Sequence, residues 1–206
     1  MAANFLNFLI SFALLMVGVT VHEFAHGWVA YKRGDNTAKL SGRLTLNPLA
    51  HIDPIMTFIF PLLLYLSTGG RFVFGAAKPV PVDFSALRKP RSDMVLVGLA
   101  GPAANFLLAL LLSLLWKVMP QYQLNSFIFN SLITINVVLG VFNLIPIPPL
   151  DGSRILMGLL PPRLAYKYAG IDRFGFIIII ALLWLGVLDL VIFPLVNLIL
   201  NFLGQL

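Results

Sequence analysis

The sequence of 206 residues contains no cysteine and few charged residues. Without cysteine, the chain has no disulfide bonds, thiolate metal ligands or cysteine nucleophiles. Charged residues make up 11% of the chain and hydrophobic residues 59%, whereas a typical soluble domain has roughly 25% charged residues. One small core cannot bury so many apolar side chains, and the mean hydropathy is +0.94. The composition therefore predicts a membrane protein.

The apolar residues are gathered in uncharged or nearly uncharged runs. These runs cover residues 1–31, 94–116, 118–150, 174–188 and 190–206. A helix needs about 20 apolar residues to cross a bilayer, so the first three runs are long enough and the last two are short. We expect an all-α polytopic membrane protein with about five transmembrane helices, folded as a single domain over residues 1–206. Its core would cover residues 4–160, followed by a helical hairpin at 174–206 or by one span and an interfacial helix.

The basic residues are unevenly distributed between the apolar runs. The 14 Lys and Arg residues lie almost entirely in three segments, at 32–53, 71–93 and 152–173. Because cytoplasmic loops of membrane proteins collect Lys and Arg, all three segments are expected in the cytoplasm. The uncharged run at 54–70 would then be a re-entrant segment, unless it is an ordinary span where the rule fails. The net charge of +6 reflects this topology, and we expect no nucleic-acid partner.

Two stretches look extended rather than helical. Residues 40–46 alternate between leucine and polar side chains, and residues 71–82 combine β-branched residues with prolines. Proline cannot donate to a strand ladder, so the second stretch suits an edge strand. We therefore expect a small β element at the cytoplasmic interface.

An HExxH motif, His22-Glu23-x-x-His26, lies inside the first apolar run. Residues four apart share one face of a helix, so both imidazoles can reach one metal ion. The glutamate can then take a proton from bound water. The alternative is a helix end from which these side chains reach interfacial water. Glu23 lies nine residues before Lys32, about 13 Å along a helix axis, which is too deep for that alternative.

A third metal ligand must come from elsewhere, because catalytic zinc usually has three protein ligands and a water. The candidates are His51, Asp53, Asp151 and Asp189. Asp151 is favoured because three prolines at 146–149 end the preceding helix, and unwound backbone at membrane depth borders protein or a watery cavity. If His51 is not the third ligand, it either lies near the metal as a gate or is a solvated or turn-capping histidine. Lys78 either lines a substrate path or is a surface lysine.

Three motifs occur in a characteristic order. They are HEFAH at 22–26, GPAAN at 101–105 and NLIPIPPLDG at 143–152. In this order and spacing the chain resembles the site-2 protease family of intramembrane zinc metalloproteases over roughly residues 10–160. Many bacterial members carry a PDZ domain between core helices and others a nucleotide-sensing domain, and we expect this chain to be a compact member without either.

The resemblance implies one Zn²⁺ ion bound by His22, His26 and Asp151, with Glu23 as general base. It further implies a three-helix core that holds the site inside the bilayer and opens to cytoplasmic water. Asn143 would lie near the metal as a donor to the oxyanion. Asn105 would support the site or helix packing.

The expected activity is hydrolysis of a peptide bond in or near a transmembrane segment of another membrane protein. The partners would be that substrate and membrane lipid, and the expected location is a prokaryotic plasma membrane. A substrate helix must unwind first, and it could then add as a strand to residues 71–82. The alternatives are a transporter whose buried charges form an ion pathway and an inactive relative that binds membrane proteins without cleaving them.

Overall fold

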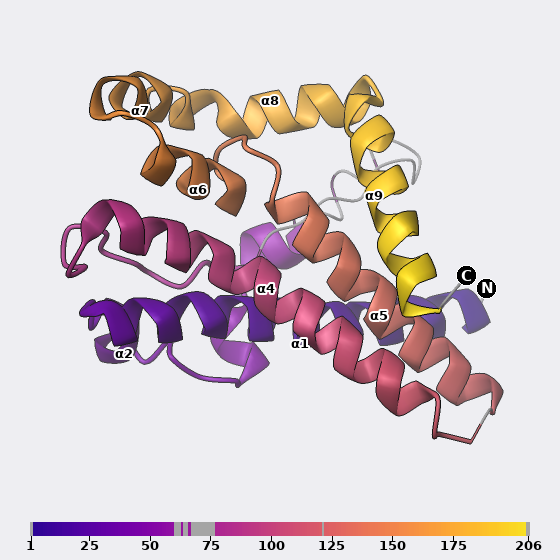
Figure 1. Cartoon of the computed structure of the whole chain (residues 1–206). Coiled ribbons are helices and arrows are strands. Elements are labelled where there is room, and N and C mark those ends of the chain that lie inside the picture. Colours follow the sequence, from indigo (N-terminus) through magenta and orange to yellow (C-terminus); the bar gives the residue numbers. More distant parts are fainter. Residues whose placement is uncertain (1, 60–62, 64–65, 67–76, 121, 205–206) are drawn as a thin grey trace.

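The structure is a computed structural model that describes residues 2–59, 63, 66, 77–120 and 122–204 (Figure 1). Within these residues every assigned element is helical. The elements are α1 (Ala2–Arg33), α2 (Thr37–Leu40), η1 (Pro48–His51), η2 (Pro54–Ile59), α4 (Pro90–Trp116), α5 (Gln123–Asn143), α6 (Asp151–Leu159), α7 (Pro162–Ala169), α8 (Asp172–Trp184) and α9 (Val187–Leu203). The expectation of an all-α protein is thus confirmed for the described part of the chain.

Three helices in the described residues are long and apolar enough to cross a membrane. They are the Leu9–Arg33 part of α1, α4 and α5. The shorter C-terminal runs form α8 and α9, which meet at an angle of 78° and together qualify as one bent span. The described residues therefore contain three spans, or four with the bent pair, and five separate spans are not confirmed.

The three long helices pack together, with α4 against both α1 and α5 (Figure 1). Small residues allow the close approach: a Cβ atom at Gly140 of α5 would lie 2.6 Å from the Phe106 ring of α4. Such small residues commonly mediate helix packing in membranes. α5 also shares an apolar cluster with α4, α8 and α9, which includes Ala109, Ile133, Ile179, Ile192 and Val196.

The three basic segments, 32–53, 71–93 and 152–173, meet at one end of the helix bundle. The Arg88 N–H donates to the Arg33 carbonyl at 2.9 Å, and the Arg33 Nε atom lies 3.7 Å from Asp93 Oδ1. The Arg91 guanidinium donates to the Leu160 carbonyl. The end of α1, the start of α4 and the end of α6 therefore lie together, so the chain between α1 and α4 leaves and rejoins the bundle at the same end.

The expected strand at 40–46 is wrong. Leu40 is the last residue of the short helix α2, and residues 41–46 form turns and bends, with Gly42 at a φ of 68°. The Asp35 carboxylate starts α2 by accepting hydrogen bonds from the Thr37 N–H and hydroxyl, and such local side-chain bonds outweigh a short alternating pattern. In the second stretch, residues 77–82 carry no strand and residues 71–76 lie outside the described residues. Most of the expected re-entrant run at 54–70 lies outside them as well; its first residues form η2.

The proline-rich segment after α5 reverses the chain. The segment at 144–150 leads into α6, which returns along the first half of α4. A Cβ atom at Gly152 would lie 2.5 Å from the Ile145 carbonyl oxygen, so only glycine allows this turn to close. The reversal places Asp151, the first residue of α6, opposite α1.

Candidate metal centre

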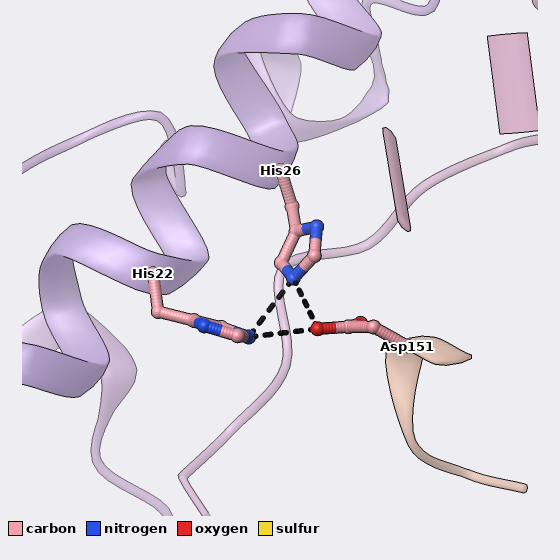
Figure 2. A group of neighbouring side chains, drawn as sticks. All are labelled: His22, His26 and Asp151. Atoms are coloured by element: carbon pink, nitrogen blue, oxygen red, sulfur yellow. Dashed lines mark hydrogen bonds and ion pairs between the residues drawn. The ribbon is translucent and has the colours of Figure 1, made fainter. Parts of the chain in front are cut away.

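Two histidines of α1 and the first residue of α6 converge on one point (Figure 2). His22 Nε2 lies 3.0 Å from His26 Nε2 and 3.0 Å from Asp151 Oδ2. His26 Nε2 lies 3.2 Å from the same carboxylate oxygen. Both histidines are buried, with exposed fractions of 5% and 7%. The structure thus brings together the three side chains that the sequence predicts as ligands.

The partners of the other ring nitrogens fix the tautomer of each histidine. His26 Nδ1 lies 2.7 Å from the Val97 carbonyl, and His22 Nδ1 lies 2.6 Å from Asn105 Oδ1. Both partners only accept hydrogen bonds, so both Nδ1 atoms carry the proton. Each neutral imidazole therefore directs the lone pair of Nε2 toward the shared point, as a metal-ligating histidine does.

The orientation of the Asn105 amide is set by a chain of buried hydrogen bonds. Asn136 Nδ2 donates to the Leu132 carbonyl at 2.8 Å, so Asn136 Oδ1 faces the other way and accepts from Asn105 Nδ2 at 2.7 Å. Asn105 Nδ2 also donates to the Gly18 carbonyl at 3.1 Å. The Oδ1 atom of Asn105 is then left to face His22. A helix carbonyl of α5 thereby determines which nitrogen of His22 is free to bind a metal ion.

The donor set fits a zinc ion. Two unprotonated nitrogens and a carboxylate oxygen repel one another at about 3 Å unless a cation lies between them. Asp151 Oδ2 is buried and accepts no hydrogen bond. Zinc bound tetrahedrally at about 2.0–2.1 Å places neighbouring ligand atoms roughly 3.3 Å apart, close to the observed separations of 3.0 to 3.2 Å. The donors are the nitrogen and oxygen types found in catalytic zinc sites.

Gly101 of α4 forms the wall behind the two histidines. A Cβ atom at this position would lie 2.6 Å from His22 Nε2 and still closer to His26 Nε2. No side chain larger than hydrogen can therefore occupy this position while the two rings stay in place. The residues packed against Gly101 are therefore the two histidines themselves.

Glu23 lies between the two histidines in sequence and is half-buried. Its Oε2 atom accepts a hydrogen bond of 2.7 Å from the main-chain N–H of Val80. The carboxylate is thus held by a segment that is distant in sequence.

The other predicted residues lie outside the three-residue group. Asn143 donates through Nδ2 to the Leu139 carbonyl of its own helix at 3.0 Å. His51 is fully buried, and its Nε2 atom lies 3.0 Å from the Thr45 carbonyl. The side chain of Lys78 is exposed.

The two remaining candidates for the third ligand have different surroundings. The Asp53 carboxylate accepts the N–H groups of Ile55 and Met56 at the start of η2. Asp189 lies in the first turn of α9.

Comparisons with known proteins identify the family of this chain. The model described as "Peptidase family M50" matches residues 10–127 and 119–185. The chain is 41% identical to the "Putative zinc metalloprotease YwhC" of Bacillus subtilis, over 89% of this chain and 84% of the relative. It is 31% identical to the "Putative zinc metalloprotease Rip2" of Mycolicibacterium smegmatis, over 96% and 75% of the two chains. No solved structure matches the chain significantly. The chain therefore belongs to peptidase family M50, the site-2 protease family, and is a zinc metalloprotease with membrane-spanning helices.

Proposed function

We propose that this enzyme hydrolyses a peptide bond in or next to a transmembrane segment of another membrane protein. The observation that carries the proposal is the position of the metal-binding group, whose two histidines are buried on α1, one of the membrane-spanning helices. Ionisable groups at such a depth are costly and are usually functional. A site built there is suited to a substrate that also lies in the membrane.

His22, His26 and Asp151 would hold the zinc ion. When bound, the ion makes a water molecule more acidic and polarises the scissile carbonyl group. Glu23 accepts the proton of the attacking water on its carboxylate and delivers it to the leaving amine. Asn143 serves as a donor to the developing oxyanion: an amide NH₂ has two N–H groups, and the bond to Leu139 uses one of them.

The substrate has to present an extended backbone, because a helix hides its own carbonyl groups. The segment at 77–82 lies next to Glu23 through the Val80 contact. It carries no strand partner among the described residues. The N–H groups of Lys78 and Val80 are already engaged, so an unwound substrate can donate main-chain hydrogen bonds to the remaining carbonyl groups of this segment.

We infer that the site opens to the cytoplasm from a plasma membrane of a prokaryote. The meeting of three basic segments at one end of the bundle, through the Arg33, Arg88 and Arg91 contacts, supports a single cytoplasmic side for all of them. His26 lies seven residues before Arg33, about 10 Å from that end. Water can reach the site over this distance more easily than from the opposite face.

The experiment that tests the function compares the wild-type enzyme with Glu23→Gln in liposomes that contain a model transmembrane substrate. Glutamine fills the same space but cannot accept the water proton. We expect cleavage to fall by about 10²- to 10⁴-fold, with zinc content unchanged. A soluble peptide of the same sequence serves as the second substrate. Cleavage by Glu23→Gln at the wild-type rate would refute the role of the base, and preference for the soluble peptide would refute the substrate class.

A further inference from the structure

The segment that contacts Glu23 has an unusual arrangement of hydrogen-bond donors. Val80 stands between Pro79 and Pro81, and proline has no main-chain N–H. Val80 therefore carries the single main-chain donor of these three residues. That donor lies 2.7 Å from Glu23 Oε2. We propose that the main-chain N–H of Val80 positions the Glu23 carboxylate for proton transfer, an inference that rests on the proposed role of Glu23 as general base.

The helix surface beside Glu23 is shaped to receive Val80. Gly27 lies four residues after Glu23, so the two residues share one face of α1. The side chain of Val80 packs there: its Cγ1 atom lies 3.0 Å from where a Gly27 Cβ would be. Val80 is 7% exposed. The missing side chain at Gly27 thus lets the main chain of Val80 approach closely enough to reach the carboxylate.

The segment is also held from its other side. The Lys78 N–H donates to the His51 carbonyl at 2.9 Å, and the Arg43 guanidinium donates to the Lys78 carbonyl at 2.7 Å. His51 is fixed in turn by its contact with the Thr45 carbonyl. The Val80 N–H is therefore a donor with a fixed direction, and two residues singled out by the sequence, His51 and Lys78, contribute main-chain atoms to holding it.

A fixed donor matters because a glutamate side chain has three rotatable bonds. A hydrogen bond to a charged carboxylate is short and strong, and it selects one side-chain orientation. With Oε2 engaged by Val80, Oε1 is left to accept the proton from water. Pre-orientation of a reacting group contributes to the rate of the chemical step without changing how tightly substrate or zinc binds.

The test replaces the amide of residue 80 by an ester, which removes this N–H and keeps the valine side chain. The full-length enzyme with the α-hydroxy analogue of valine is assayed with the transmembrane substrate. We expect kcat to fall about ten- to a hundredfold, while KM and zinc content stay within about twofold. Val80→Pro, which also removes the donor, shows the same loss. Val80→Ala keeps the donor, and we expect its kcat to be at least tenfold higher than that of Val80→Pro.

Two results would overturn the proposal. An ester enzyme with wild-type kcat would show that the N–H does not act on Glu23. A change in KM or zinc content without a loss of kcat would show that the contact only supports the fold. Failure of the proposed function is distinguishable, because in that case Glu23→Gln itself remains active. An inactive Glu23→Gln combined with a fully active ester enzyme refutes only the positioning role of Val80.

Discussion

A single methyl group at Gly101 is expected to prevent zinc binding. The alanine Cβ would lie 2.5 Å from His22 Cε1 and 2.6 Å from His22 Nε2, whereas ordinary contacts begin at 3.4 Å. The nearest atom of the His22 ring would have to retreat by about 0.9 Å to reach an ordinary contact. Its Nδ1 atom is held by Asn105 at 2.6 Å, so the ring cannot retreat freely. His26 meets the same methyl group and is held by Val97.

The expected loss in zinc affinity is large. Functional groups have to stay within about 0.5 Å of their working positions, and the displacement at Gly101 exceeds this for both histidines. Loss of an outer hydrogen-bond partner alone typically lowers metal affinity by about 10- to 100-fold. Because Gly101→Ala displaces the ligand atoms themselves, we expect at least the upper end of that range. Cleavage should fall in proportion to the bound zinc.

Gly98→Ala is the matched control, since it makes the same change one turn earlier in α4. The nearest atoms to that Cβ, in Ile155 and Asp151, lie at 3.1 and 3.2 Å. The second of these atoms is the main-chain carbonyl oxygen of Asp151. Both atoms would have to give by only a few tenths of an ångström, which lies within the roughly 0.5 Å tolerance of a functional site, so zinc affinity should fall by no more than about threefold. The assay is competition for zinc against a chelator in detergent, with helix content measured by circular dichroism. If folded Gly101→Ala bound zinc as tightly as the wild type, the assigned position of the metal would be wrong.

Two further predictions concern the metal ligand on α6 and the buried amide chain. Asp151→Ala should lose bound zinc, because the third donor disappears, whereas Asp189→Ala should retain it; metal analysis of the purified proteins decides, and the reverse pattern would exclude Asp151 as a ligand. Asn136→Leu should lower zinc affinity about 10- to 100-fold, because Asn105 is then free to turn its NH₂ group toward His22. Asn201→Leu, at an exposed position of α9, is its control, and equal zinc affinities in the two variants would refute the role of the amide chain.

The sequence contained enough information to predict which three side chains come together at the proposed metal site, because the signals for them are local. The spacing of His22 and His26 fixes a shared helix face whatever the rest of the fold does. The prolines at 146–149 end a helix wherever it packs, so Asp151 had to follow a break in an apolar run. Apolar run length likewise identified α1, α4 and α5 as membrane helices. Each of these inferences needed only short-range geometry.

The contacts that support the triad were not predictable in the same way. Asn136 lies in the middle of an apolar run. A polar side chain inside a membrane span is energetically costly, and this cost alone could have marked Asn136 as a functional residue. Its partner, Asn105, comes from another helix, which only the packing of α4 on α5 reveals. The Val80 contact with Glu23 spans 57 residues. The prediction of a strand at 40–46 was wrong because the alternating pattern there is weak, and the Asp35 contacts that start α2 outweigh it.

The hydrogen bonds of the polar groups around this site support the proposed position of the zinc ion. Inside a membrane, each unsatisfied polar group costs several kcal/mol, so polar atoms there find partners within the protein. The Nδ1 atoms of both histidines have such partners, and so do the side-chain amides of Asn105 and Asn136. The acceptors that remain are the two Nε2 atoms and one oxygen of Asp151, all aimed at one point. Hydrogen bonding among acceptors cannot satisfy them, but a cation does. The hydrogen bonds of the two Nδ1 atoms and of the Asn105 and Asn136 amides fix the orientation of the histidine rings. They therefore keep the lone pairs of the Nε2 atoms directed at the metal.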